Sequence, residues 1–196
     1  MTGARPAPIH VPARRGFAAL DELALVPWRN IRHIYGVGVL SDGLEHDVAG
    51  SLRHLAANPS AAIHALYSNI CHQGTICEAA AYAAPFIASI AAGDIEEGLA
   101  FKLMLLLANL TMISAADEGW LDVQRAGDEV RELVRDAILC SHDHIEAIGS
   151  VHRGCVALAE ATIALATHPS LEGLSELHSL MGDYAAIDLP DSRSSN

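Results

Sequence analysis

The chain has 196 residues, of which 51% are hydrophobic and 5% aromatic, and its formal net charge is −12. The length allows one domain or one short superhelical array, and an apolar content of mostly Ala, Leu, Ile and Val favours helices over sheets. The electrostatic field of a negatively charged protein repels phosphate backbones. The composition therefore argues against nucleic acid as the main ligand and is compatible with a basic protein partner.

The two ends of the chain differ in composition from the rest. Residues 1–16 are rich in Pro, Ala and Arg, and they predict a disordered N-terminal arm. Residues 185–196 predict a flexible polar tail. The segment between them, 17–184, is expected to form a single helical domain.

The first predicted helices follow from an apolar stripe and a helix-start signal. Leu44, Val48, Leu52 and Leu55 share one helical face. Asn58-Pro59 supplies an N-cap and a proline at the first helical position, where its missing N–H is harmless. About seven helices are predicted, near residues 43–57, 59–72, 76–92, 95–115, 121–139, 143–167 and 170–181.

The turn His72-Gln73-Gly74-Thr75 predicts a helix stop followed by a helix start. Gly74 suits the left-handed conformation that ends many helices. Thr75 with Glu78, three residues on, matches a capping box for the next helix. Asp94 is expected to cap the following helix in the same way.

The two helices that follow, 76–92 and 95–115, are apolar nearly all round and must be covered on most sides. Their continuous apolar stretches are shorter than the roughly 18 residues of a membrane span. Pro85 is expected to kink the first of them. Short loops make neighbours antiparallel, so the predicted fold is all-α, an α-solenoid of stacked antiparallel helix pairs with these two in the middle.

Three segments carry a resemblance to a known group. They are the stretch from Trp28 to Tyr35-Gly36, the His72-Gln73-Gly74-Thr75 turn, and Ala84-Pro85-Phe86-Ile87. The chain resembles bacterial HEAT-repeat-like, armadillo-type proteins with a W…YG segment, an HQGT turn and an APF[IL] helix, over about a third of its length. The resemblance implies a scaffold that holds a protein partner, or an immunity-type inhibitor of a toxin, and it implies no cofactor and no catalytic residue.

The HQGT turn is also the first candidate binding site. His72, Gln73 and Thr75 could form a polar site where two helices meet, with Trp28 and Tyr35 beside it. The alternative is structural: Gly74 and Thr75 end and start helices, and the aromatic side chains pack against the turn. The residues alone leave both interpretations open.

A second candidate is a metal site at His142, His144 and Glu146. His142 and Glu146 are four residues apart and share a helical face, and imidazole and carboxylate are zinc ligands. The spacing matches no established zinc pattern, and acidic residues in a first helical turn are also explained by the helix dipole. The hypothesis drawn from this cluster is a metal-dependent enzyme.

The principal hypothesis is a non-catalytic scaffold or adaptor that binds a protein partner. Four cysteines without a CxxC pair, and no apolar signal segment near the N-terminus, predict a reduced protein in the cytoplasm without a membrane segment. A homodimer formed through the apolar helices is a further possibility.

Overall fold

The computed structural model describes residues 8–37, 47–72, 74–116 and 127–185. This part is mostly helical, which confirms the all-α class. Its α-helices are α1 Val48–His54, α2 Pro59–Ile70, α3 Glu78–Ala91, α4 Glu97–Ala115, α5 Asp128–Cys140, α6 His142–Val151, α7 Val156–Thr167 and α8 Leu171–Met181. The short 3-10 helices are η1 Gly16–Leu25, η2 Trp28–Asn30, η4 Arg153–Cys155 and η5 Gly182–Tyr184, and the strands are β1 Arg32–His33, β2 Gly36–Val37, β3 Cys71–His72 and β4 Thr75–Ile76.

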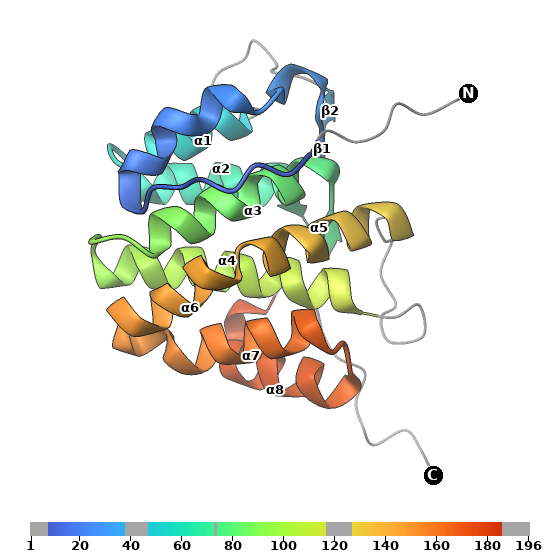
Figure 1. The fold of residues 1–196 in the computed structure, drawn as a ribbon. Coiled ribbons are helices and arrows are strands. Elements are labelled where there is room, and N and C mark those ends of the chain that lie inside the picture. The colour runs from blue at the N-terminus through green and yellow to red at the C-terminus, as the bar shows by residue number, and fades with distance from the viewer. Residues whose placement is uncertain (1–7, 38–46, 73, 117–126, 186–196) are drawn as a thin grey trace.

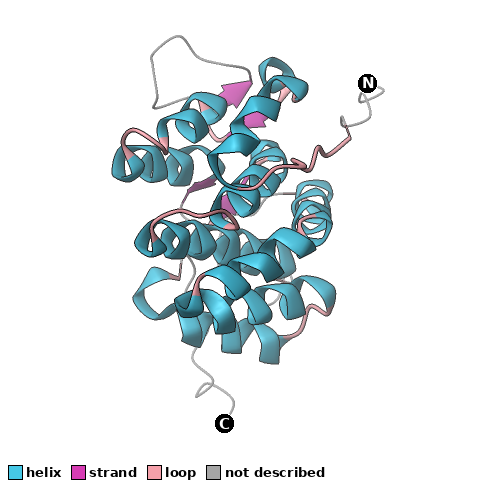
Figure 2. Ribbon diagram, turned by 60° about the vertical axis from the view of Figure 1, so that its left-hand side comes forward, coloured by secondary structure: helices cyan, strands magenta, loops and turns pink. Residues whose placement is uncertain are grey.

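η1, α1 and α2 lie at one end of the fold and α7 and α8 at the other, while α5 and α6 pack beside the central helices (Figures 1 and 2). α3 and α4 form the centre. α3 contacts η1, α1, α2, α4, α5 and α6, while α4 contacts α2, α3, α5, α7 and α8. Every residue of 79–91 and of 103–115 is buried, so the prediction that these two helices are covered on most sides is confirmed.

α4 has the length and composition of a membrane-crossing helix, with mean hydropathy 1.7 over an 18-residue window. However, 83% of that window is buried inside the fold, as the core helix of a helical protein requires. The helix itself was predicted over 95–115; the comparison with a membrane span used only its continuous apolar stretch, which is shorter than α4 because the first turns of α4 are more polar.

The single helix predicted for 143–167 is wrong, because α6 and α7 are separate helices joined through η4. His152 lies at the break, 6% exposed, and its Nε2 is 3.2 Å from the carbonyl oxygen of Gly93. The two helices pack against each other closely enough that a Cβ at Gly149 would lie 3.4 Å from Val156 Cα. No proline marks this break, and the short polar run His152-Arg153-Gly154 is the only local signal; contacts with other elements stabilise the turn, including the hydrogen bond from Gly154 N–H to Glu97 Oε1.

The predicted disordered arm differs from expectation in its described part, residues 8–15, which we call the N-terminal strap. The strap runs in extended form across α3 (Figure 1). Its backbone is held by side chains from three elements: Ala13 N–H donates to Glu22 of η1, Ser89 Oγ of α3 donates to the Arg14 carbonyl, and His144 Nε2 of α6 lies 2.9 Å from the Pro12 carbonyl. Because these partners are far away in the sequence, composition alone could not reveal the strap.

The caps confirm one helix-start prediction and contradict two. Asn58 Oδ1 accepts a hydrogen bond from Ala61 N–H at 3.3 Å, with Pro59 at the first position of α2, as predicted. The residues before α3 and α4 are Cys77 and Glu96, and neither makes a side-chain cap bond. Thr75 and Asp94 therefore do not cap these helices.

Thr75 instead lies in β4, where it pairs with His72 of β3 in a short antiparallel hairpin. Its expected capping partner, Glu78, accepts a hydrogen bond from Arg32 N–H at 3.2 Å. The HQGT turn is thus a hairpin turn between α2 and α3 rather than a helix stop followed directly by a helix start.

Gly74 in this hairpin turn has a φ of +74°, so its predicted left-handed conformation is confirmed. Replacing Gly74 with alanine is expected to lower the free energy of unfolding by about 1–2 kcal/mol, because Cβ clashes with the backbone in this region. Denaturant unfolding followed by circular dichroism measures this loss. Gly127→Ala is the control, since Gly127 has a φ of −59° and open space around a Cβ; an equal loss in both variants would contradict the prediction.

Candidate functional site

Three of the five predicted binding residues lie together at the two hairpins. The rings of Tyr35 and His72 have centroids 6.5 Å apart, and Thr75 pairs with His72 across the second hairpin. Ile34 N–H donates to the Asn69 carbonyl at 3.0 Å and ties the first hairpin to the end of α2. Gln73 lies outside the described residues.

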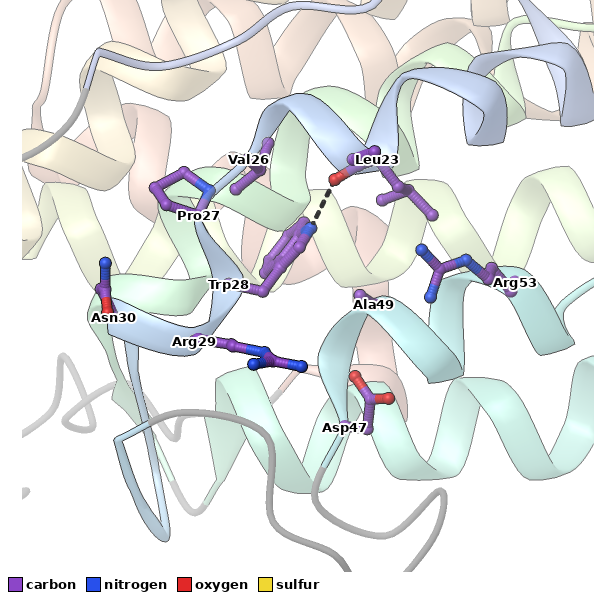
Figure 3. Close-up of a pocket in the computed structure, with 10 residues that line it drawn as sticks. Leu23, Val26, Pro27, Trp28, Arg29, Asn30, Asp47, Ala49 and Arg53 are labelled. Atoms are coloured by element: carbon purple, nitrogen blue, oxygen red, sulfur yellow. Dashed lines mark hydrogen bonds between the residues drawn. The ribbon is translucent and has the colours of Figure 1, made fainter.

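Trp28, the fifth predicted residue, makes different contacts. Its indole Nε1–H donates to the Leu23 carbonyl at 2.9 Å, and its ring lies 6.2 Å from the ring of Phe86 in α3. The indole lines an open pocket of about 540 Å³ at the N-terminal end of the stack (Figure 3). We call this the Trp28 pocket; its main lining residues are Val26, Pro27, Trp28, Arg29, Asp47 and Arg53.

The charged groups of the Trp28 pocket come from separate elements. Arg29 belongs to η2, Arg53 to the last turn of α1, and Asp47 is the N-cap of α1. The Asp47 carboxylate accepts a hydrogen bond from Gly50 N–H at 2.9 Å. Among the described residues, neither arginine forms an ion pair within 4.0 Å of a carboxylate.

A buried histidine, His33, lines a small cavity next to this pocket. His33 is 4% exposed, and its Nδ1 accepts a hydrogen bond from Tyr35 N–H at 3.2 Å, which leaves the proton of the neutral ring on Nε2. Within the described part of the chain, Nε2 has no hydrogen-bond partner. His33 borders a cavity of about 10 Å³, room for one water molecule, and Trp28 and Asp47 line both this cavity and the larger pocket.

A second concave surface lies between α6 and α7, at the other end of the stack. This α6–α7 groove has a volume of about 470 Å³. Its lining includes the apolar side chains of Val156, Ala159 and Ile163 and two exposed glutamates, Glu146 and Glu160. His142 also lines it.

The structure does not bring the predicted metal ligands together. His142 and Glu146 line the α6–α7 groove, but His144 is 9% exposed and its Nε2 contacts the Pro12 carbonyl of the strap. In the described ranges, no group of three or more His, Cys, Asp or Glu side chains is arranged to hold a metal ion. The pairing of His142 with Glu146 on one helical face was predicted from spacing, whereas the inward direction of His144 was not.

The buried cysteines are poor nucleophiles. Burial raises the pKa of the Cys71 thiol to about 12 and that of the Cys77 thiol to about 11. Burial also raises the pKa of Cys155 to about 11. These three thiols stay protonated at neutral pH, and the thiolate is the reactive form.

Sequence reasoning missed the arginines of the Trp28 pocket and Glu160 of the α6–α7 groove. Arg29 and Arg53 are distant in the chain, and no spacing rule relates a residue of η2 to one of α1. Glu160 and Glu146 lie on different helices, so their approach depends on how α6 packs on α7. No local signal could have found either pair.

Comparisons with known proteins give no match among family models, curated proteins or solved structures. The resemblance to HEAT-repeat-like proteins therefore stays a prediction that rests on the three sequence segments. Function is argued below from the geometry of the chain itself.

Proposed function

We propose that this protein is a non-catalytic adaptor, a helical-repeat scaffold of stacked antiparallel helix pairs, that binds a protein partner through the α6–α7 groove. The observation that carries the proposal is a largely apolar groove lined also by two glutamates that form no ion pair among the described residues. An immunity-type inhibitor of a toxin is a special case, in which the partner is the toxin.

The shape and apolar lining of the groove suit a partner side chain inserted between two helices. Val156, Ala159 and Ile163 present apolar surface, and a volume of about 470 Å³ admits one or two large side chains. Val151 and Val156, at the ends of the two helices, are 50% and 39% exposed. An amphipathic helix laid into such a groove buries its apolar face there.

The charges around the groove select the partner. Glu146 and Glu160 form no ion pair within 4.0 Å among the described residues, and the whole chain carries a net charge of −12. A partner segment with an apolar side chain flanked by Lys or Arg would complement both the apolar lining and the two glutamates of the groove. Charge complementarity of this kind raises the association rate and excludes acidic partners.

The test compares capture of partners by the wild-type protein with capture by a groove variant, Glu146→Lys with Glu160→Lys. A basic protein retained by the wild type from the native lysate is expected to bind the groove variant at least about tenfold more weakly in a following calorimetric titration, because attraction becomes repulsion. The control, Glu172→Lys with Glu176→Lys, makes the same charge change on exposed positions of α8.

Retention of the partner by the control and its loss by the groove variant supports the proposal. Equal binding to all three proteins refutes the α6–α7 groove as the docking site. Failure of the wild-type protein to retain any partner near stoichiometry refutes the adaptor function.

A further inference from the structure

The Trp28 pocket is not used by the proposed docking surface, which lies at the opposite end of the stack (Figure 1). It differs from the α6–α7 groove in charge as well as position. Two arginines and one aspartate line it, in a chain that has 12 basic and 24 acidic residues. A cationic pocket on an acidic protein calls for a functional explanation.

Within the described ranges, the two arginines of the pocket are not engaged by a carboxylate. Figure 3 shows the side chains of Arg29 and Arg53 on two sides of the Trp28 indole, coming from η2 and α1. Among the described residues neither has a carboxylate partner within 4.0 Å, and the Asp47 carboxylate is engaged by Gly50 N–H. Guanidinium groups bind carboxylate and phosphate oxygens through paired N–H donors.

The Trp28 indole in the same pocket is held in place before any ligand arrives. Its Nε1–H donates to the Leu23 carbonyl, and Phe86, 0% exposed, packs against its ring. One part of the Trp28 side chain remains accessible in the pocket. A fixed aromatic surface offers stacking to a planar apolar group without loss of side-chain freedom on binding.

A small cavity that shares wall residues with the pocket contains a further polar group. His33 Nε2–H is a buried donor without a partner in the described ranges, and its small cavity shares Trp28, Asp47 and Ala49 with the pocket. One water molecule in that cavity would satisfy the donor and present a polar contact towards a ligand.

We propose that the Trp28 pocket binds a small organic oxyanion, a carboxylate or phosphate attached to a planar apolar body. The oxyanion lies between the Arg29 and Arg53 guanidinium groups, and the planar body lies against the indole. The pocket volume of about 540 Å³ falls within the range of small-molecule sites. The negative charge of the protein opposes the approach of an anion, but at physiological ionic strength this repulsion is screened beyond about 8 Å.

The test follows the fluorescence of Trp28. The chain has two tryptophans, and the substitution Trp120→Phe leaves Trp28 as the only one. The probes are benzoate and phenyl phosphate, with benzyl alcohol as the uncharged control. Both anions are expected to change the Trp28 emission until it reaches a plateau. Benzyl alcohol at the same concentrations is expected to leave the emission unchanged. The tighter of the two anions identifies a carboxylate or a phosphate as the natural group.

Variants separate this site from general charge effects. Arg29→Gln and Arg53→Gln are each expected to weaken binding by about tenfold, because one charge-assisted contact is lost. Arg153→Gln removes the same charge from an exposed position outside the pocket and is expected to leave binding unchanged. Circular dichroism melts confirm that each variant is folded.

An emission change that does not saturate, an equal effect of benzyl alcohol, or equal weakening by Arg153→Gln would overturn the proposal. The result is independent of the adaptor function, since no residue of the α6–α7 groove is changed and no protein partner is present. Saturable binding lost on both pocket substitutions establishes a small-molecule site.

Discussion

Replacing Phe86 with alanine is expected to lower the free energy of unfolding by about 3–5 kcal/mol, the usual cost of removing a buried phenyl ring. Phe86 lies in the central helix α3 and is 0% exposed. Its ring is 6.0 Å from that of His10 in the strap and 6.2 Å from that of Trp28. The substitution therefore leaves a cavity where the strap, η2 and α3 meet.

Chemical denaturation monitored by circular dichroism measures the loss. Phe101→Ala is the matched control, because Phe101 is only partly buried and its ring faces Tyr184 at 6.5 Å. Its expected loss is smaller, since less apolar surface is removed from the interior. A Phe86→Ala protein as stable as the Phe101→Ala protein would show that the ring is not part of the core.

The second large effect is expected at Gly93, where the end of α3 meets the start of η1. A Cβ built at Gly93 would fall onto the backbone N and Cα of Gly16, far inside van der Waals contact. Backbone atoms cannot rotate out of the way as a flexible side chain does. We expect Gly93→Ala to lower the free energy of unfolding by about 2–3 kcal/mol, near the upper end for overpacked sites.

The control for Gly93→Ala is the same substitution a few residues further on. A Cβ at Gly98 would lie 3.2 Å from Glu96 Oε1, the end of a flexible side chain, and Gly98 is inside α4. Gly98→Ala is therefore expected to stabilise the protein, by up to about 1 kcal/mol, through helix propensity. Thermal melts that move in the same direction for both variants would contradict the close approach of Gly16 and Gly93.

Features that depend on neighbours in the chain were predictable. The Asn58 cap acts within four residues, and its hydrogen bond to Ala61 is present. The left-handed conformation of Gly74 follows from the residue type and its turn. The β-hairpin around this turn was not predictable. A direct helix–helix turn was expected, but Cys71 pairs with Ile76 across two short strands.

The strap shows the limit of composition as a guide. A segment rich in Pro, Ala and Arg predicts disorder when its own side chains bury little surface. Residues 8–15 are nevertheless held, because Glu22, Ser89 and His144 bind their backbone from three other elements. His144 thereby takes part in the packing of the strap.

By itself the sequence determined the helical class and the burial of the two central helices, because both follow from the period and density of apolar residues along short stretches. Only the tertiary structure decided where the chain breaks between α6 and α7, which polar groups hold the strap, and which charges share a pocket. Arg29 and Arg53 line one pocket, and Glu146 and Glu160 line one groove, because separate elements pack together there. The contacts that bring such pairs together lie between segments distant in the chain, and no local pattern of residues encodes them.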